Sequence, residues 1–189
     1  MPTRTFVAVE ATALQNRRAI GLIDRLRPLA PQARWVQEEQ LHLTALFLGD
    51  LADQDLADVC SQAEWVARAN QPFTLRLQGV GAFPHLDRPR AMWLGVAEGG
   101  DEVTRLHTDL LDAVGEYVAT RDRRPFVPHL TLARFARTGR HSPNLTAVLA
   151  GLAGYDAGAG HIDELVVYAS ELQRDGPEYY PLARCPLGD

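Results

Sequence analysis

Short apolar runs alternate with longer amphipathic stretches along the chain, and this pattern predicts strands interleaved with helices. Apolar or alternating runs rich in β-branched and aromatic residues are typical of strands. They occur at residues 6–9, 41–48, 73–77, 91–96, 129–135, 161–170 and 179–184. Glycine-rich and proline-rich stretches between them predict turns or loops. These stretches are Gly49-Asp50, 79–90 and 151–160.

Four stretches carry apolar residues at helical spacing. They are 11–29, with Leu14 on the predicted apolar face, then Asp53 to about Ala69, Asp101 to about Tyr117, and 144–150. Aspartate is a preferred N-cap residue, so Asp53 and Asp101 are the expected caps of the second and third helices. The alternation of strands and helices predicts a mixed α and β protein.

The tripeptide His-Leu-Thr occurs twice, at His42 to Thr44 and at His129 to Thr131, each time inside a predicted strand. Side chains i and i+2 of a strand lie on one face, so each copy places an imidazole beside a hydroxyl. The copies start 87 positions apart in a chain of 189 residues. This spacing predicts two lobes related by a pseudo-twofold axis, each contributing one motif strand to a shared cleft.

Two histidines and two threonines around one small anion suit acid–base chemistry on a phosphate diester. Imidazole can act as acid or base near neutral pH. The threonine hydroxyls can donate to phosphate oxygens as negative charge builds up. The sequence has no carboxylate cluster or His/Cys set at metal-ligand spacing, so we expect no metal requirement.

Composition narrows the classes of function. All 19 basic residues are arginine, and the missing lysine excludes a P-loop, a lysyl-adenylate ligase and Schiff-base chemistry. The net charge of −5 argues against non-specific binding to nucleic acid. Cys60 and Cys185 fit neither a metal site nor a disulfide framework. The sequence shows no signal-peptide pattern and no membrane span, which predicts a cytoplasmic protein, and we expect a monomer.

One arginine-rich region and four further histidines are also candidates. Residues 121–140 contain the arginines 121, 123, 124, 134, 137 and 140. Arg134 follows His129 in one strand, but strict alternation turns it away from the cleft, so it reaches a phosphate only if the strand twists or bulges. We expect structural roles for the remaining histidines, which are His85, His107, His141 and His161. Trp35, Phe6 and the tyrosines can stack on a base, although core packing is the default for each.

The chain resembles the 2H phosphoesterases, and within them the bacterial and archaeal RNA 2′,3′-cyclic phosphodiesterases, also known as 2′–5′ RNA ligases. The resemblance rests on both His-x-Thr motifs and on further segments in the same order. The segments are 4–8, Trp35 with 42–49, 81–84, 89–95, 128–134, and 170–172 with 176–179.

The resemblance implies one bilobal α+β domain over residues 1–189, with antiparallel sheets lining a central cleft, helices outside, and no cofactor. It implies hydrolysis of RNA 2′,3′-cyclic phosphate ends, or of small cyclic nucleotides, to 2′-phosphomonoesters, together with an ATP-independent 2′–5′ ligation. His42 corresponds to the proton donor and His129 to the acceptor. Thr44, Thr131 and Arg134 correspond to phosphate-binding residues.

Two other functions fit parts of the pattern. One is a phosphodiesterase that acts on 2′–5′ oligonucleotides or another small cyclic phosphate. The other is a binding module for nucleotides or RNA that does no chemistry. Intact His and Thr at both motifs argue against the binding module, because binding alone does not need two proton-transfer groups.

Overall fold

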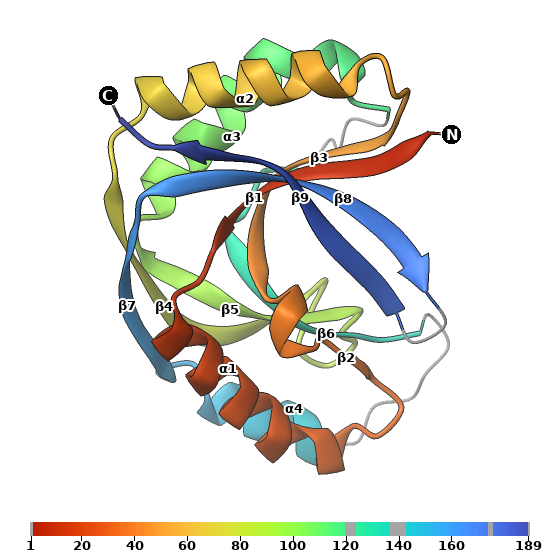
Figure 1. The fold of residues 1–189 in the computed structure, drawn as a ribbon. Coiled ribbons are helices and arrows are strands. Elements are labelled where there is room, and N and C mark those ends of the chain that lie inside the picture. The colour runs from red at the N-terminus through yellow and green to blue at the C-terminus, as the bar shows by residue number, and fades with distance from the viewer. Residues whose placement is uncertain (1, 120–123, 137–142, 174–175, 189) are drawn as a thin grey trace.

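Two antiparallel β-sheets lie at the centre of the molecule and helices cover their outer faces (Figure 1). This is a computed structural model, and it describes residues 2–119, 124–136, 143–173 and 176–188. Sheet A has the order β3-β1-β8-β9, formed by His42–Leu51, Thr3–Glu10, Glu164–Gln173 and Gly176–Pro186. Sheet B has the order β2-β6-β5-β4-β7, formed by Arg34–Trp35, His129–Arg134, Ala91–Glu98, Phe73–Phe83 and Asp156–Ile162.

Two of the four helices cross from the sheet that they follow to the other sheet. Helices α2 (Leu56–Ala69) and α3 (Gly100–Val114) pack on sheet A, while α1 (Ala13–Leu26) and α4 (Pro143–Gly151) pack on sheet B. Helix α1 follows β1 of sheet A, and α3 follows β5 of sheet B, so each crosses to cover the other sheet. Short helical turns η1, η2 and η3 span Arg27–Leu29, Glu38–Gln40 and Gly115–Tyr117. The predicted bilobal α+β architecture with outer helices is confirmed.

The apolar core is continuous between the lobes. Buried leucines, valines and alanines from both sheets and from the helices form one contact cluster. A second, smaller cluster on sheet A contains Phe6, Ala8, Val166 and Tyr168, with Tyr179 packed beside it. No helix in the described ranges is long and apolar enough to cross a membrane.

Both motif strands carry a β-bulge at the same place. In the pairing of β1 with β3, Ala8 faces Thr44 and Val7 faces Leu46, so Ala45 is an extra residue. In the pairing of β5 with β6, Trp93 faces Thr131 and Met92 faces Ala133, so Leu132 is extra. A bulge shifts the alternation of the strand by one residue. The third side chain after each threonine therefore returns to the face of that threonine.

Several predicted boundaries are wrong for local reasons. Asp53 and Asp101 are not the N-caps, because α2 begins after Asp55 and α3 begins after Gly99, whose φ of 83° suits glycine. The predicted glycine loops are partly strand, since β4 runs through residues 79–83 and β7 begins at residue 156. Gly49, predicted in a turn, lies within β3. Glycines with positive φ occupy irregular positions of these strands, where a bulge needs that conformation.

The first helix is anchored by a buried polar residue that the sequence pattern did not reveal. Gln15 is fully buried, whereas Leu14 is 41% exposed. The Gln15 side-chain amide donates to the backbone carbonyls of Leu75 in β4 and Gly158 in β7, at 2.9 and 3.1 Å. Its carbonyl oxygen accepts from the backbone N–H of Thr12, as in a capping box. The side chain of Gln15 therefore caps the N-terminus of α1 and also joins the helix to sheet B.

Replacing Gln15 by Leu is expected to lower the free energy of unfolding by about 1–3 kcal/mol, because two buried carbonyls lose a donor. Urea unfolding followed by circular dichroism measures this loss. The matched control is Gln32→Leu at an exposed position, which we expect to change stability by less than about 0.5 kcal/mol. Equal stability of the two variants would contradict the anchoring role.

Candidate active site

The two motif strands contact each other where the sheets meet. Strand β3 is the edge of sheet A, and β6 is flanked on its outer side only by the two-residue strand β2. His42 and His129 each begin their strand, and each is half-buried. The electrostatic influence of His129 and of Arg134 reaches His42. The fold thus brings together the two motifs that are 87 positions apart in the sequence.

The imidazole of His42 is held by a hydrogen bond at each nitrogen. Its Nδ1 lies 2.8 Å from the backbone carbonyl oxygen of Gln40, and its Nε2 lies 3.0 Å from the hydroxyl oxygen of Thr44. A carbonyl can only accept, so Nδ1 carries the proton. Nε2 is then the nitrogen that can exchange a proton with a ligand, and it lies beside the motif threonine.

His129 is oriented in the same way. Its Nδ1 lies 2.7 Å from the carbonyl oxygen of Val127, again two residues earlier in the chain. This bond fixes the proton on Nδ1 and leaves Nε2 for chemistry. The two histidines therefore share the same local geometry as well as the same tripeptide.

Aromatic rings surround both imidazoles. Phe6 stacks on His42 with ring centroids 4.7 Å apart, and Tyr179 meets its edge at 5.3 Å. Phe83 meets the edge of His129 at 5.1 Å, and Trp93 lies 6.1 Å away. These rings restrict the orientation of each imidazole and remove water from one side of it.

Burial and nearby positive charge lower the pKa of both imidazoles. The pKa of His42 is lowered to about 4, mainly by burial and then by the charges of Arg134 and His129, against the opposing effects of the Gln40 carbonyl and of Glu10. The pKa of His129 is also lowered, first by burial and then by Arg134, while the hydrogen bond to Val127 opposes this. A positive charge disfavours a second one nearby.

Arg134 lies on the strand face that carries His129 and Thr131 because of the bulge at Leu132. The bulge reverses the parity that strict alternation gives, so that Arg134 returns to the face of His129 and Thr131. The arginine is exposed, and it makes no ion pair with a carboxylate of the described residues. Its charge acts on both histidines and on Tyr179.

Phe47 is the counterpart of Arg134 in the first motif, and the sequence analysis missed it. The two six-residue segments His42–Phe47 and His129–Arg134 share one burial pattern that ends on an exposed side chain. Phe47 is 44% exposed, and the guanidinium of Arg4 lies 4.7 Å from the centre of its ring. Comparison of the sixth position of each motif would have identified both residues.

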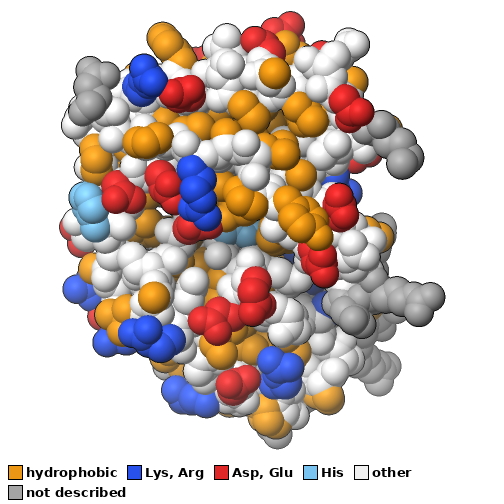
Figure 2. All heavy atoms as spheres, in the orientation of Figure 1, with side chains coloured by type: hydrophobic (Ala, Val, Ile, Leu, Met, Phe, Trp, Pro, Cys, Tyr) orange, Lys and Arg blue, Asp and Glu red, His pale blue; other side chains and the backbone are white. Residues whose placement is uncertain are grey.

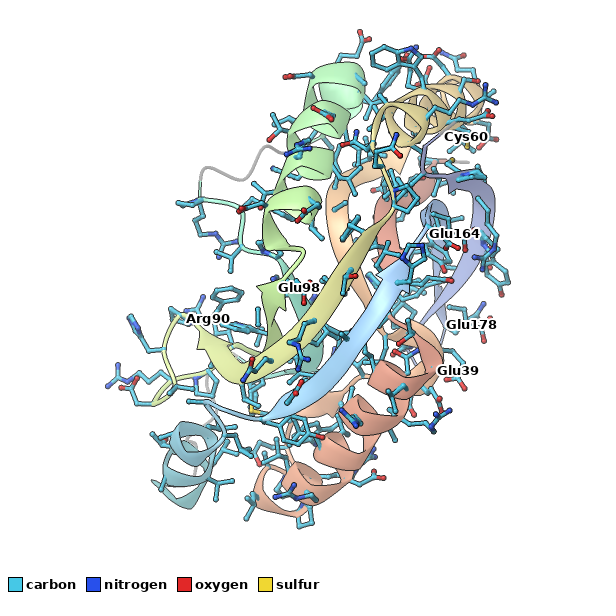
Figure 3. The ribbon with its side chains drawn as sticks, turned by 90° about the vertical axis from the view of Figure 1, so that its left-hand side faces the viewer. Glu39, Cys60, Arg90, Glu98, Glu164 and Glu178 are labelled. Atoms are coloured by element: carbon cyan, nitrogen blue, oxygen red, sulfur yellow. The ribbon has the colours of Figure 1, made fainter. Side chains whose placement is uncertain are left out.

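One side of the site is acidic. A pocket beside His42 is lined by Glu10, Glu38 and Glu39 together with Tyr168 and Tyr179. Figure 2 shows acidic side chains gathered at the centre of this face. Figure 3 shows Glu39 and Glu178 on this side of the molecule and Arg90 on the opposite side.

A hydrogen-bond network fixes the position of Glu10. Its carboxylate accepts from the Tyr168 hydroxyl and from the Arg184 guanidinium, which also bonds Glu164. Glu10 and His42 are directly paired residues of β1 and β3. The negative charge of Glu10 therefore raises the pKa of His42, opposing the effect of Arg134.

The other candidates do not belong to the paired motifs, although His107 contacts Ala45 of the first motif strand. His85 and His161 are exposed, and His107 lies on α3. Trp35 packs against the core, as expected by default. His141 and four arginines of the basic region, at positions 121, 123, 137 and 140, are outside the described residues. Within the described residues, no group of three or more His, Cys, Asp or Glu side chains is arranged to hold a metal ion.

Comparisons with known proteins agree with this geometry. A family model described as the 2′-5′ RNA ligase superfamily matches residues 12–173. The RNA 2′,3′-cyclic phosphodiesterase of Thermus thermophilus is 33% identical over 175 residues, which cover 88% of this chain and 83% of that protein. The Escherichia coli protein of the same name is 30% identical over 188 residues, which cover 98% and 97%.

Solved structures match over almost the whole chain. The crystal structure of TT0787 from Thermus thermophilus has a TM-score of 0.82 at 28% identity and covers 98% of this chain and 99% of its own. The crystal structure of Escherichia coli LigT complexed with 3′-AMP has a TM-score of 0.80 at 26% identity, with 100% of both chains covered.

Replacing Arg134 by Gln is expected to raise the pKa of both His42 and His129, since the arginine charge lowers both. Titration of the imidazole resonances by NMR measures these pKa values. Arg4→Gln is the matched control, because Arg4 influences Tyr179 but neither histidine. Unchanged histidine pKa values in the Arg134 variant would show that its guanidinium points away from the site.

Proposed function

Because the chain belongs to the 2′-5′ RNA ligase superfamily, we propose that it hydrolyses the 2′,3′-cyclic phosphate at RNA ends to a 2′-phosphomonoester. The observation that carries this proposal is the matched pair of imidazoles. Each has its Nδ1 bound to a backbone carbonyl, and each leaves Nε2 for proton transfer. The names of the curated relatives support the choice of substrate.

In the proposed reaction His129 is the base and His42 is the acid. Nε2 of His129 accepts a proton from water while the water oxygen attacks phosphorus. The bond between phosphorus and the ribose O3′ breaks, and Nε2 of a protonated His42 gives its proton to O3′. The product carries the phosphate on O2′, and the enzyme returns to its first state when a proton moves from His129 to His42 through solvent.

Thr44, Thr131 and Arg134 are proposed to stabilise the phosphate. The hydroxyl of Thr44 lies 3.0 Å from Nε2 of His42, where the reacting group must lie. Thr131 occupies the matching position in the second motif. Donors aimed at the oxygens that gain charge lower the barrier. The positive charge of Arg134 lies near both histidines and adds to this effect.

The low pKa of His42 implies that substrate binding is needed to protonate His42, the proposed acid. In the substrate-free site, burial and Arg134 keep His42 neutral down to about pH 4. A phosphodiester carries one negative charge, and its position between the imidazoles offsets the charge of Arg134. A nearby opposite charge raises the pKa of an imidazole. Substrate binding is therefore expected to place on His42 the proton that the reaction consumes.

The charges and the exposed ring around the site support binding of the RNA end in one orientation. The acidic pocket beside His42 repels further phosphates, so the RNA chain is expected to leave the site on the side of Arg134. The exposed ring of Phe47 offers a surface on which the terminal base can stack. The proposed substrate is a chain end, because a ribose whose 2′ and 3′ oxygens share one cyclic phosphate has no following nucleotide.

Incubation of the protein with RNA that ends in a 2′,3′-cyclic phosphate, in the presence of EDTA, tests the function. We expect a 2′-phosphate product, resolved from the 3′-isomer by ³¹P NMR. His42→Ala and His129→Ala are each expected to lower kcat about 10²–10⁴-fold, the usual contribution of a general acid or base. His161→Ala at an exposed strand position is the control and should retain full activity.

Three results would contradict parts of this proposal. Absence of cyclic-phosphate hydrolysis by the wild-type protein would contradict the function itself. Activity that EDTA abolishes and one divalent ion restores would contradict the metal-independent mechanism. Full activity of either motif variant with a native circular dichroism spectrum would contradict the two-histidine chemistry.

The pH dependence is expected to differ between kcat/KM and kcat. The profile of kcat/KM reflects the free enzyme, in which both histidine pKa values are lowered, whereas kcat reflects the complex, in which the phosphate charge raises them. The bell-shaped profile of kcat should therefore lie at higher pH. In whatever activity remains, His42→Ala should lack the alkaline limb and His129→Ala the acidic limb.

If the pH profiles of kcat and kcat/KM coincide, substrate binding does not raise the pKa of His42 and so does not protonate it. Limbs lost in the opposite order would exchange the acid and base roles of the two histidines. Both outcomes are read from initial rates between pH 4 and about 9, a range chosen to include the lowered pKa of His42.

A further inference from the structure

A third histidine connects the two motifs without belonging to either. His107 lies on α3 beside core residue Leu106 and is half-buried. Its Nδ1 lies 2.7 Å from the backbone carbonyl oxygen of Ala45, in the first motif strand. Its ring stacks on Phe126 with centroids 4.0 Å apart and planes only 5° from parallel. Phe126 leads into the second motif strand.

The hydrogen bond from His107 reaches the bulge of β3. Ala45 is the extra residue of that bulge and directly follows Thr44. The extra residue of a bulge lacks a regular partner in the ladder, so its polar groups need another one. The second motif has the same need, and there the backbone N–H of Val36 donates to the carbonyl of Leu132 at 3.0 Å. His107 thus does with a side chain in one lobe what a backbone group does in the other.

The stacking contact of His107 is with Phe126, which directly precedes Val127, and the Val127 carbonyl orients His129. Val127 follows Phe126 directly, and its carbonyl oxygen accepts from Nδ1 of His129. Phe126 is partly buried and packs against the core. A parallel ring contact holds its partner in orientation as well as in distance. A chain of direct contacts and covalent bonds therefore links His107 through Phe126 and Val127 to His129.

We propose that His107 is a positioning residue that sets the relative placement of the two motifs. It secures the bulge that returns Phe47 to the face of His42 and Thr44, and it holds the Phe126–Val127 segment against the same bulge. This inference rests on the proposed function, because it assigns His107 a role in aligning the acid with the base. Misplacement of reacting groups by about 1 Å can cost a factor of about 100 in rate.

Three substitutions separate the two contacts. His107→Asn keeps an N–H donor near the position of Nδ1 and loses the stack, His107→Phe keeps the stack and loses the donor, and His107→Leu loses both. The control is His161→Leu on β7, an exposed histidine outside the site. We expect His107→Leu to lower kcat about 10- to 100-fold with little change in KM. The Asn and Phe variants should each retain part of the activity, and the control all of it.

A readout that needs no substrate accompanies the kinetics. The ¹⁵N spectra of the imidazoles should show a single Nδ1–H tautomer for His42 and His129 in the wild-type protein. In His107→Leu and His107→Asn, which lack the stack on Phe126, His129 should become a mixture of tautomers. A general loss of stability would lower activity but would not change the tautomer of folded protein.

The outcomes decide the proposal. Wild-type kcat and wild-type tautomers in folded His107→Leu protein would overturn it, and so would Asn and Phe variants that both match the wild type if the Leu variant does not fold. A wild-type protein without activity on cyclic-phosphate RNA would contradict the proposed function, while the tautomer comparison would still judge the positioning role. Reduced kcat together with mixed His129 tautomers supports it.

Discussion

The hydrogen bond from Nδ1 of each motif histidine to the carbonyl two residues earlier is the contact on which the site depends. It is 2.8 Å long at His42 and 2.7 Å long at His129. It fixes the tautomer, so the reactive nitrogen of each ring is always Nε2. The bulges, the aromatic rings and the strand contact between the lobes all act on imidazoles that this bond has already oriented.

The two motifs share one backbone geometry, but the residues around them differ. In the proposed reaction, this difference suits two histidines that transfer protons in opposite directions. Arg134 ends the second motif, and the exposed ring of Phe47 ends the first. Glu10 raises the pKa of His42 but does not act on His129. The equivalent strands thus give both histidines the same backbone geometry, while residues at a few non-equivalent positions give them different electrostatic surroundings.

The positive charge near the two histidines has the opposite sign to the net charge of the molecule. The chain carries a net charge of −5, and an acidic pocket lies directly beside His42. Among the described residues, Arg134 is the arginine whose charge acts on both histidines. In the proposed function, this local positive charge attracts the phosphate of the RNA end despite the net negative charge of the chain.

The sequence by itself located the paired motifs and predicted the chemistry and the general plan. The repeated His-Leu-Thr tripeptide identified the paired imidazoles and hydroxyls, and its spacing predicted the two lobes, because strand alternation is a local property. The tertiary structure decided what depends on partners distant in sequence. It decided that Arg134 shares the strand face of His129, because a bulge is set by the neighbouring strand, and that Gln15 is buried, because its partners lie in β4 and β7. It also decided that His107 joins the motifs, because a helical period cannot tell a packing histidine from one that bonds a strand 62 residues away.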